Sequence, residues 1–189
     1  MVGGEVAQRR EQLVLAAFGR VAEAGFEGLR LRQVAEDVGI DHSTLHHHFA
    51  TKQHLVDAVA EYATRQFWVL GTGPDDPVAA LRAHLAGLRA MLDDRPDLFA
   101  VTVELDLRAR RDPAVAEAMD RYQAGWREVL TGLFTRGNDR GSWAVPVDPA
   151  VATELVIAAV KGVRLAPGTA GPVFAQLADL MITGGGGRT

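Results

Sequence analysis

Apolar residues recur every three or four positions along this chain, and no segment shows the two-residue alternation of a strand. Val14, Phe18 and Val21 mark a first helix over about residues 5–24, which Gly25 ends. Stripes of the same period follow at Leu55, Val59 and Tyr62, at Val78, Leu81, Leu85, Leu88 and Leu92, at Val115, Met119, Tyr122, Trp126, Val129 and Leu133, and at Val173, Leu177 and Leu180. Together with two short helices near the N-terminus and two largely apolar segments over residues 97–110 and 151–163, these stripes predict an all-α fold of nine helices.

Polar residues mark where several of these helices begin. An aspartate stands directly before a proline at Asp76-Pro77, Asp112-Pro113 and Asp148-Pro149. The aspartate can cap a helix, and proline is tolerated at the first helical position, so each pair predicts a helix N-terminus. We expect Thr51 to cap a longer helix from Lys52 to about Leu70, before the chain breaker at residues 71–74.

The stripes also suggest how the chain is organised. We expect an N-terminal domain over residues 7–67 and a C-terminal helical domain over residues 68–183. Residues 184–189 are glycine-rich and predict a flexible tail. Within the C-terminal domain, residues 97–110 and 151–163 are apolar on most faces, which favours helices that are covered on more than one side.

Two very short helices around a glycine are predicted over about residues 30–49. The first has a small apolar face made by Val34, Ala35 and Val38. Gly39 breaks it, and Asp41 is suited to cap a second helix over residues 42–48. That second helix is poor in apolar surface and rich in hydrogen-bond donors, a pattern typical of a DNA-reading helix-turn-helix.

These residues carry a family resemblance. The order Ala16-Ala17-x7-Gly25-Phe26-x7-Val34-Ala35-x3-Gly39-Ile40-x3-Thr44-Leu45-x3-Phe49-x2-Lys52-x2-Leu55 resembles the TetR family of bacterial transcriptional repressors over about residues 9–65. The resemblance implies a nine-helix homodimer whose N-terminal three-helix head binds palindromic double-stranded operator DNA. It also implies that a small molecule bound in the C-terminal body releases the DNA.

The residues expected to contact DNA lie in and beside the motif. They are Arg30, Arg32, His42, Ser43, Thr44, His46, His47, His48 and Lys52. The sequence departs from the family at Arg30, where a capping Ser or Thr is usual, and at His46, where Tyr is usual. Arg9 and Arg10 either embrace the DNA backbone or form a solvated terminus.

Five of the six histidines lie between positions 42 and 54. His42 and His46 are four residues apart and could share a metal ion, but a stable zinc site needs three or four ligands. His47 and His48 point in other directions around the helix, so we expect no metal site. Because histidine gains a proton just below neutral pH, we instead expect operator affinity to rise as pH falls.

Composition tests the DNA-binding interpretation and does not favour it. The net charge is −4, and the first 70 residues carry seven basic and nine acidic side chains. This balance leaves an alternative open: a helical small-molecule-binding or enzymatic protein with a degenerate head. The absence of cysteine rules out disulfides. With neither a signal peptide nor a segment long enough to span a bilayer, we expect a cytoplasmic protein without a membrane partner.

No sequence pattern of catalysis is visible, so we expect neither an enzyme nor a cofactor. The charged residues between Glu104 and Asp112 are interpreted as a solvated surface. In a TetR-type body the core is hollowed for the effector, which implies a pocket for an apolar or aromatic molecule lined by Phe67, Trp68, His84, Leu88, Phe99, Val103, Tyr122 and Trp126. The last two helices are expected to form the dimer interface through Val151, Leu155, Ala159, Val173, Leu177 and Leu180.

Overall fold

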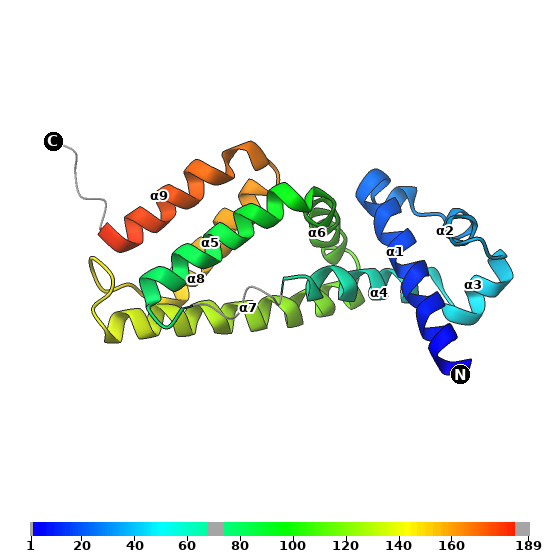
Figure 1. The fold of residues 1–189 in the computed structure, drawn as a ribbon, viewed down its shortest axis with the longest axis horizontal. Helices are drawn as coiled ribbons and strands as arrows, with labels where there is room; N and C mark the ends of the chain where they lie inside the picture. The colour runs from blue at the N-terminus through cyan, green and yellow to red at the C-terminus, as the bar shows by residue number, and fades with distance from the viewer. Residues whose placement is uncertain (1, 68–73, 184–189) are drawn as a thin grey trace. The chain divides into compact units, whose positions relative to one another are not determined.

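The computed structural model describes residues 2–67 and 74–183, and within these ranges every regular element is helical (Figure 1). The elements are α1 (Val2–Gly28), α2 (Leu31–Val38), α3 (His42–His48), α4 (Lys52–Arg65), α5 (Pro77–Asp94), α6 (Pro96–Ala109), α7 (Pro113–Asp139), α8 (Pro149–Val163), the 3-10 turn η2 (Pro167–Thr169) and α9 (Ala170–Thr183). The predicted all-α fold is confirmed, with nine α-helices in the described part of the chain. None of the described helices combines the length and apolar character that crossing a bilayer requires.

The predicted helix starts are confirmed by their hydrogen bonds. The Asp76 carboxylate accepts from the backbone N of Ala79 at 2.7 Å, and Asp148 accepts from the N of Ala150 at 2.9 Å. Asp112 makes a longer bond of the same kind, 3.4 Å from the N of Val115. The Thr51 hydroxyl accepts from the N of His54 at 3.2 Å. These local capping bonds explain why the helices begin where they do.

Three details differ from the sequence-based expectations. Asp41 occupies the N-cap position of α3, but its side chain makes no capping bond there, so the predicted cap is wrong. Gly25 does not end α1 but breaks it, with φ 63° and ψ 179°, and the chain stays helical to Gly28. Val129 is 41% exposed, and the adjacent Leu130 takes the core position instead.

The chain divides into two compact units, and the N-terminal one combines Met1–Phe67 with Asp97–Arg121. In it, α1 packs against α2, α3 and α4 (Figure 1). The predicted core stripe of α1 is buried, and Leu45 and Phe49 anchor α3 with no exposed surface. The N-terminal stretch of this unit ends at Phe67, and α6 and the first part of α7 group with it. Which segments form independently folding domains stays a prediction.

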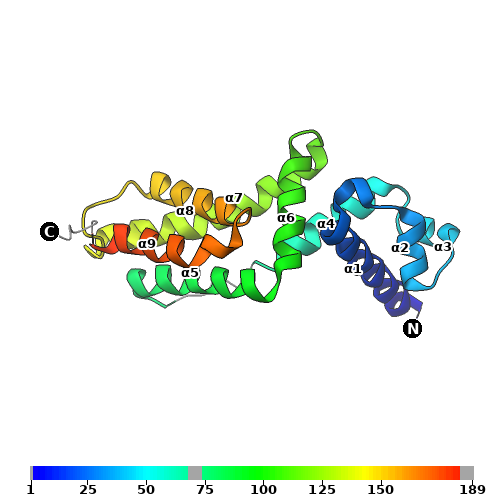
Figure 2. The same ribbon diagram turned by 90° about the horizontal axis from the view of Figure 1, so that it is seen from above.

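The second unit combines Trp68–Pro96 with Tyr122–Thr189. In its described part, α9 lies beside both α5 and α8, as the view in Figure 2 shows. Each of these helices buries a stripe of apolar residues, and that of α8 comprises Ala152, Val156, Ile157, Val160 and Val163. Three predicted features lie outside the described residues: the end of α4 near Leu70, the breaker at residues 71–73 and the tail at residues 184–189.

Candidate nucleic-acid interface and effector site

The short helix α3 presents a polar surface on a firmly anchored base. Leu45 is fully buried on the inner side of the helix. Among the residues expected to contact DNA, His42, Ser43, His46 and His47 are exposed, and Thr44 and His48 are half-buried. The rings of His42 and His46 meet edge to face with centroids 4.6 Å apart. The outer surface of α3 is therefore a row of hydrogen-bond donors and acceptors with no apolar role in folding.

The turn before α3 depends on Gly39. This residue has φ 70° and ψ 36°, a left-handed conformation that favours glycine. Its N–H donates to the carbonyl of Glu36, and the N–H of Ile40 donates to that of Ala35, each at 3.0 Å. These bonds close the C-terminus of α2 and fix the direction in which α3 leaves it.

Helix α2 begins poorly, as the sequence predicts. Arg30 occupies its N-cap position without a side-chain capping bond in the described structure. The Arg30 guanidinium instead donates to the carbonyl of Glu27. Arg32 is exposed and pairs with Glu36 at 3.1 Å along the same helix. Arg20 of α1 holds α2 in position, because it donates two hydrogen bonds of 2.8 and 2.7 Å to the carboxylate of Asp37.

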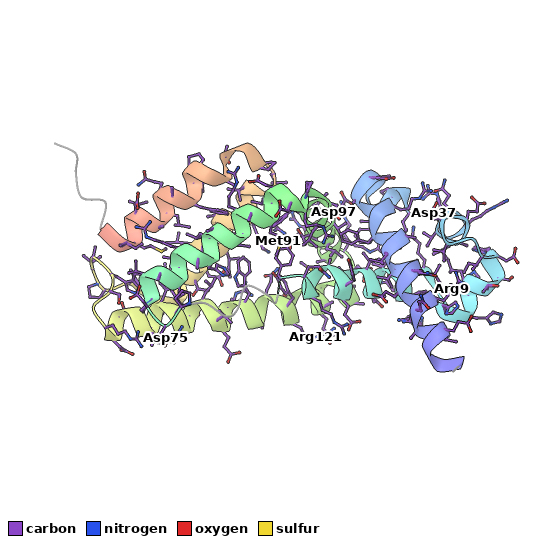
Figure 3. All side chains as sticks on the ribbon, in the orientation of Figure 1. Arg9, Asp37, Asp75, Met91, Asp97 and Arg121 are labelled. Atoms are coloured by element: carbon purple, nitrogen blue, oxygen red, sulfur yellow. The ribbon has the colours of Figure 1, made fainter. Side chains whose placement is uncertain are left out.

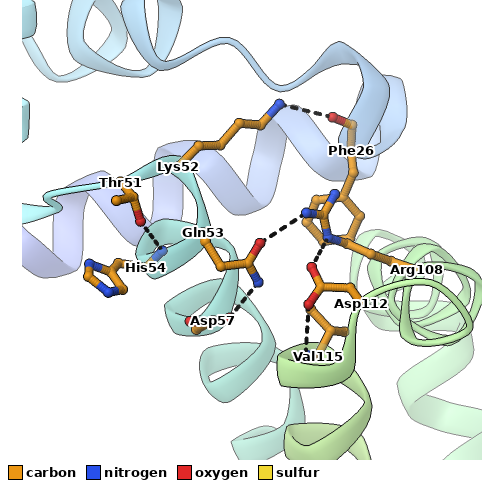
Figure 4. A network of polar contacts seen from close by, with 9 residues as sticks. All are labelled: Phe26, Thr51, Lys52, Gln53, His54, Asp57, Arg108, Asp112 and Val115. Atoms are coloured by element: carbon orange, nitrogen blue, oxygen red, sulfur yellow. Dashed lines mark hydrogen bonds and ion pairs between the residues drawn. The ribbon is translucent and has the colours of Figure 1, made fainter.

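Lys52 lies at the start of α4 with its ammonium against the end of α1 (Figure 4). It donates to the carbonyl of Leu29 at 2.8 Å and more weakly to that of Phe26 at 3.5 Å. Partial burial lowers the pKa of Lys52, and the nearby charges of Arg30 and Arg108 lower it further. Lys52 thus already has a structural role. Two other positive charges, those of Arg30 and Arg108, lie near it.

Arg9 and Arg10 reach from α1 to the C-termini of α2 and α3, and Figure 3 labels Arg9 on α1 and Asp37 on α2. Arg9 donates to the carbonyl of Val38 at 3.4 Å, and Arg10 donates to that of His48 at 2.9 Å. The Arg10 guanidinium also lies 4.0 Å from the centroid of the Phe49 ring. Both arginines therefore hold α2 and α3 against α1, whether or not they also contact DNA.

The predicted effector residues fall into two groups. In the second unit, the indole N–H of Trp126 donates to Nε2 of buried His84 at 3.0 Å, and Tyr122 stacks on Trp126. Because an indole N–H only donates, Nε2 of His84 must be unprotonated in this arrangement. Leu88 is buried in the same unit.

The other group belongs to the first unit. Phe67 and Phe99 meet edge to face with centroids 5.4 Å apart, and Val103 is half-buried. Trp68 lies outside the described residues. The prediction of one pocket from all eight residues remains untested.

A shallow cavity of about 240 Å³ lies between α5 and α9. Its lining comprises Arg82, Leu85, Ala86, Arg89, Gly171, Phe174, Ala175 and Ala178, none of which was a predicted pocket residue. Both arginines are engaged with carboxylates of the protein, Arg82 with Asp179 at 3.6 Å and Arg89 with Asp93 at 2.9 Å. Neither His84 nor Trp126 is among the residues that line this cavity.

The residues predicted for a dimer interface face away from the core of the second unit. Val151 and Leu155 of α8 are 57% and 54% exposed, and Leu180 of α9 is 52% exposed. Val173 is also exposed, whereas Ala159 and Leu177 are half-buried. Large apolar side chains on two adjacent helices thus remain uncovered in the single chain.

Sequence reasoning missed part of the polar chemistry. Glu104 and Arg108, which were assigned to a solvated surface, make cross-helix hydrogen bonds to Phe26 and Gln53. The glycine at position 25 was the available signal, because glycine often stands where another group approaches the backbone closely. Among the described residues, no group of three or more potential metal ligands is placed to hold an ion.

Comparison with known proteins adds sequence matches over both parts of the chain. Residues 13–59 match a family model described as bacterial regulatory proteins of the tetR family, and residues 77–180 match one described as the C-terminal part of BetI-type transcriptional repressors. The HTH-type transcriptional repressor AcnR of Corynebacterium diphtheriae is 32% identical over 147 residues, 76% of this chain and 74% of AcnR.

Two solved structures share the fold at low sequence identity. AibR in complex with isovaleryl coenzyme A and operator DNA has a TM-score of 0.75 at 19% identity, covering 93% of this chain and 98% of AibR. A transcriptional regulator from Saccharomonospora viridis in complex with choline also has a TM-score of 0.75, at 17% identity, covering 92% of this chain and 95% of that protein.

Proposed function

Because the chain belongs to the TetR family of bacterial regulatory proteins, we propose that it is a repressor that binds a palindromic operator as a dimer and releases it when a small molecule binds. Its activity is regulation by binding, not catalysis, and it acts in the cytoplasm. The outer surface of α3 is the observation that carries the proposal. A seven-residue helix with one buried leucine and a row of exposed polar side chains contributes little to the core and suits the major groove.

The charge distribution supports phosphate binding beside α3 despite the acidic composition. Partial burial is the main cause of the lowered pKa of Lys52, and the positive charges of Arg30 and Arg108 lie near enough to lower it further. A phosphate at this place would relieve that repulsion and favour the charged lysine. Since an ammonium has three donors, Lys52 can keep its bond to the carbonyl of Leu29 and still donate to a phosphate oxygen.

The dimer rests on the exposed face of α8 and α9. A single short recognition helix is too small for specific binding, and two copies must read successive major grooves about 34 Å apart. Pairing of α8 and α9 with the same helices of a second copy would cover Val151, Leu155 and Leu180. The twofold symmetry of such a pair matches a palindromic operator.

The effector binds in the helical body and biases the protein toward a conformation that does not fit DNA. An apolar or aromatic molecule with a polar group suits a lining that combines Tyr122, Trp126 and the His84 imidazole. To act as an inducer it must bind the DNA-free conformation more tightly, since equal affinity for both states shifts nothing. By reciprocity, operator DNA weakens effector binding by the same factor.

A gel shift with the promoter next to its own gene tests the proposal. We expect retarded DNA that a small molecule frees, and altered preference among operator variants for Ser43→Ala and His47→Ala. His54→Ala is the matched control, because His54 is an exposed histidine outside the recognition helix. An absence of DNA binding at low salt and slightly acid pH would favour the alternative of a small-molecule-binding protein with a degenerate head.

A further inference from the structure

The break in α1 is held by a residue far away in the sequence. Gly25 adopts φ 63° and ψ 179°, and the next N–H, that of Phe26, donates to Oε2 of Glu104 in α6 at 3.3 Å. A Cβ atom at position 25 would lie 2.7 Å from the same oxygen. The backbone conformation favours glycine here, and a side chain at position 25 would also displace the Glu104 carboxylate from its present place.

One turn further along α6, Arg108 also contacts α1 and connects two more elements, α4 and the start of α7 (Figure 4). Its guanidinium donates to the side-chain oxygen of Gln53 in α4 at 3.1 Å and to Asp112 at 3.0 Å. Asp112 in turn caps α7, and the Arg108 guanidinium lies 5.1 Å from the centroid of the Phe26 ring. A single side chain thus joins the end of α1, the start of α4 and the start of α7.

These contacts attach α1, α2 and α3 to the rest of their unit at a second place, in addition to their connection through α4. Helices α1 to α3 are joined to the rest of the chain through α4, and attachment at one helix alone leaves rotation about that helix open. The two hydrogen bonds from α6 act on α1 and α4 separately, at Phe26 and Gln53. Rotation of α1 to α3 about α4 would break the Phe26–Glu104 bond and move the Phe26 ring away from Arg108, whereas the Gln53–Arg108 bond holds α4 itself against α6.

We propose that Glu104 and Arg108 are positioning residues that set the orientation of α3 and hence the operator spacing that the protein accepts. The proposal rests on the proposed function as a dimeric operator-binding protein. Neither residue needs to contact DNA for this role.

The test compares two operators, the natural one and one with a single base pair inserted between its half-sites. The insertion turns one half-site by about 34° and moves it by about 3.4 Å. We expect the wild-type protein to prefer the natural operator strongly. Glu104→Ala and Arg108→Gln should each reduce this preference at least fivefold, because about 1 kcal/mol per hydrogen bond corresponds to about fivefold and each variant loses one or more bonds in both copies of the dimer. Affinities are measured by fluorescence anisotropy, and thermal unfolding verifies the fold of each variant.

The ratio of the affinities for the natural and the lengthened operator distinguishes a loss of positioning from a loss of charge. Loss of the Arg108 charge weakens binding to both operators alike and cancels in the ratio. Glu104→Gln keeps an acceptor for the Phe26 N–H and should keep the ratio, and Arg110→Gln, an exposed arginine of the same helix region, should keep it as well. Base preference within a half-site should not change in any of these variants.

The outcomes are distinct. If wild-type protein binds the operator and both Glu104→Ala and Arg108→Gln leave the ratio unchanged, the positioning role is wrong and the proposed function stands. A ratio that falls equally in Arg110→Gln also overturns the positioning role. If wild-type protein binds neither operator, the proposed function fails and the positioning role with it.

Discussion

Replacement of Lys52 by alanine separates its two roles in the structure. The hydrogen bond from its ammonium to the Leu29 carbonyl is 2.8 Å long, and the Lys52 side chain is half-buried. Hydrogen bonds to charged groups contribute about 1.5–3 kcal/mol when buried, so we expect this half-exposed one to contribute about 1 kcal/mol to the free energy of unfolding. The proposed phosphate contact adds a second effect that appears only with DNA.

The DNA effect has a calculable salt dependence. Each neutralised phosphate contributes about 0.9 to the slope of log affinity against log salt concentration, so a dimer that loses two contacts should lose about 1.8. Between about 50 and 200 mM salt, the affinity of Lys52→Ala should therefore fall roughly tenfold less than that of the wild type. The slope is measured by fluorescence anisotropy over a series of salt concentrations, well below the melting temperature.

Thr51→Ala is the matched control for the Lys52 experiment. The Thr51 hydroxyl caps α4 at 3.2 Å, and loss of such a cap costs about 1 kcal/mol without any change of charge. The two variants should thus be similarly destabilised, but only Lys52→Ala should change the slope. An unchanged slope in Lys52→Ala, or an equal change in Thr51→Ala, would refute the phosphate contact.

Three further predictions concern assembly, release and stability. Leu177→Arg places a charge in the proposed dimer face, so light scattering at micromolar concentration should show monomers that no longer bind operator; a monomeric wild type would contradict the interface. Trp126→Ala removes the donor to His84, and this variant should retain operator on addition of an inducer that releases the wild type; unchanged inducer affinity would show that the pocket lies elsewhere. The hydrogen bonds from Arg20 hold the pKa of Asp37 below its ordinary value, so their stabilisation is present above about pH 4 and is lost as the pH falls through the lower folded-state pKa. Denaturant titrations should therefore find Asp37→Asn less stable than the wild type at pH 7 and equally stable in strong acid.

Helix positions could be predicted from the sequence because their causes are local. The starts at Asp76, Asp112 and Asp148 depend on a side chain and an N–H two or three residues away. Asp41 shows the limit of such reasoning. Its backbone has the extended conformation of an N-cap, and its carbonyl accepts from the N of Leu45. The carboxylate nevertheless makes no capping bond in the described structure, and the sequence does not fix that side-chain orientation.

The contacts of α6 could not be predicted because their causes are distant in the sequence. Glu104 and Phe26 are 78 positions apart, and Arg108 and Gln53 are 55 apart. Alternating charges on a helix are usually solvated, and only the tertiary structure shows which of them meet another helix. The pattern of apolar residues indicated that α6 is covered on more than one side, but it did not indicate the partners of its charged residues.

The weak starts of α2 and α3 set a thermal limit for the regulator. Their lengths are eight and seven residues, and neither begins with a side-chain capping bond in the described structure. Helices this short are marginal in isolation, so both depend on contacts with α1 and with each other to stay folded. Local opening of such a segment requires less free energy than unfolding of the whole protein. On warming, the protein should therefore lose its ability to read DNA before its body melts, and the temperature at which repression fails would be set by fifteen residues, not by the whole chain.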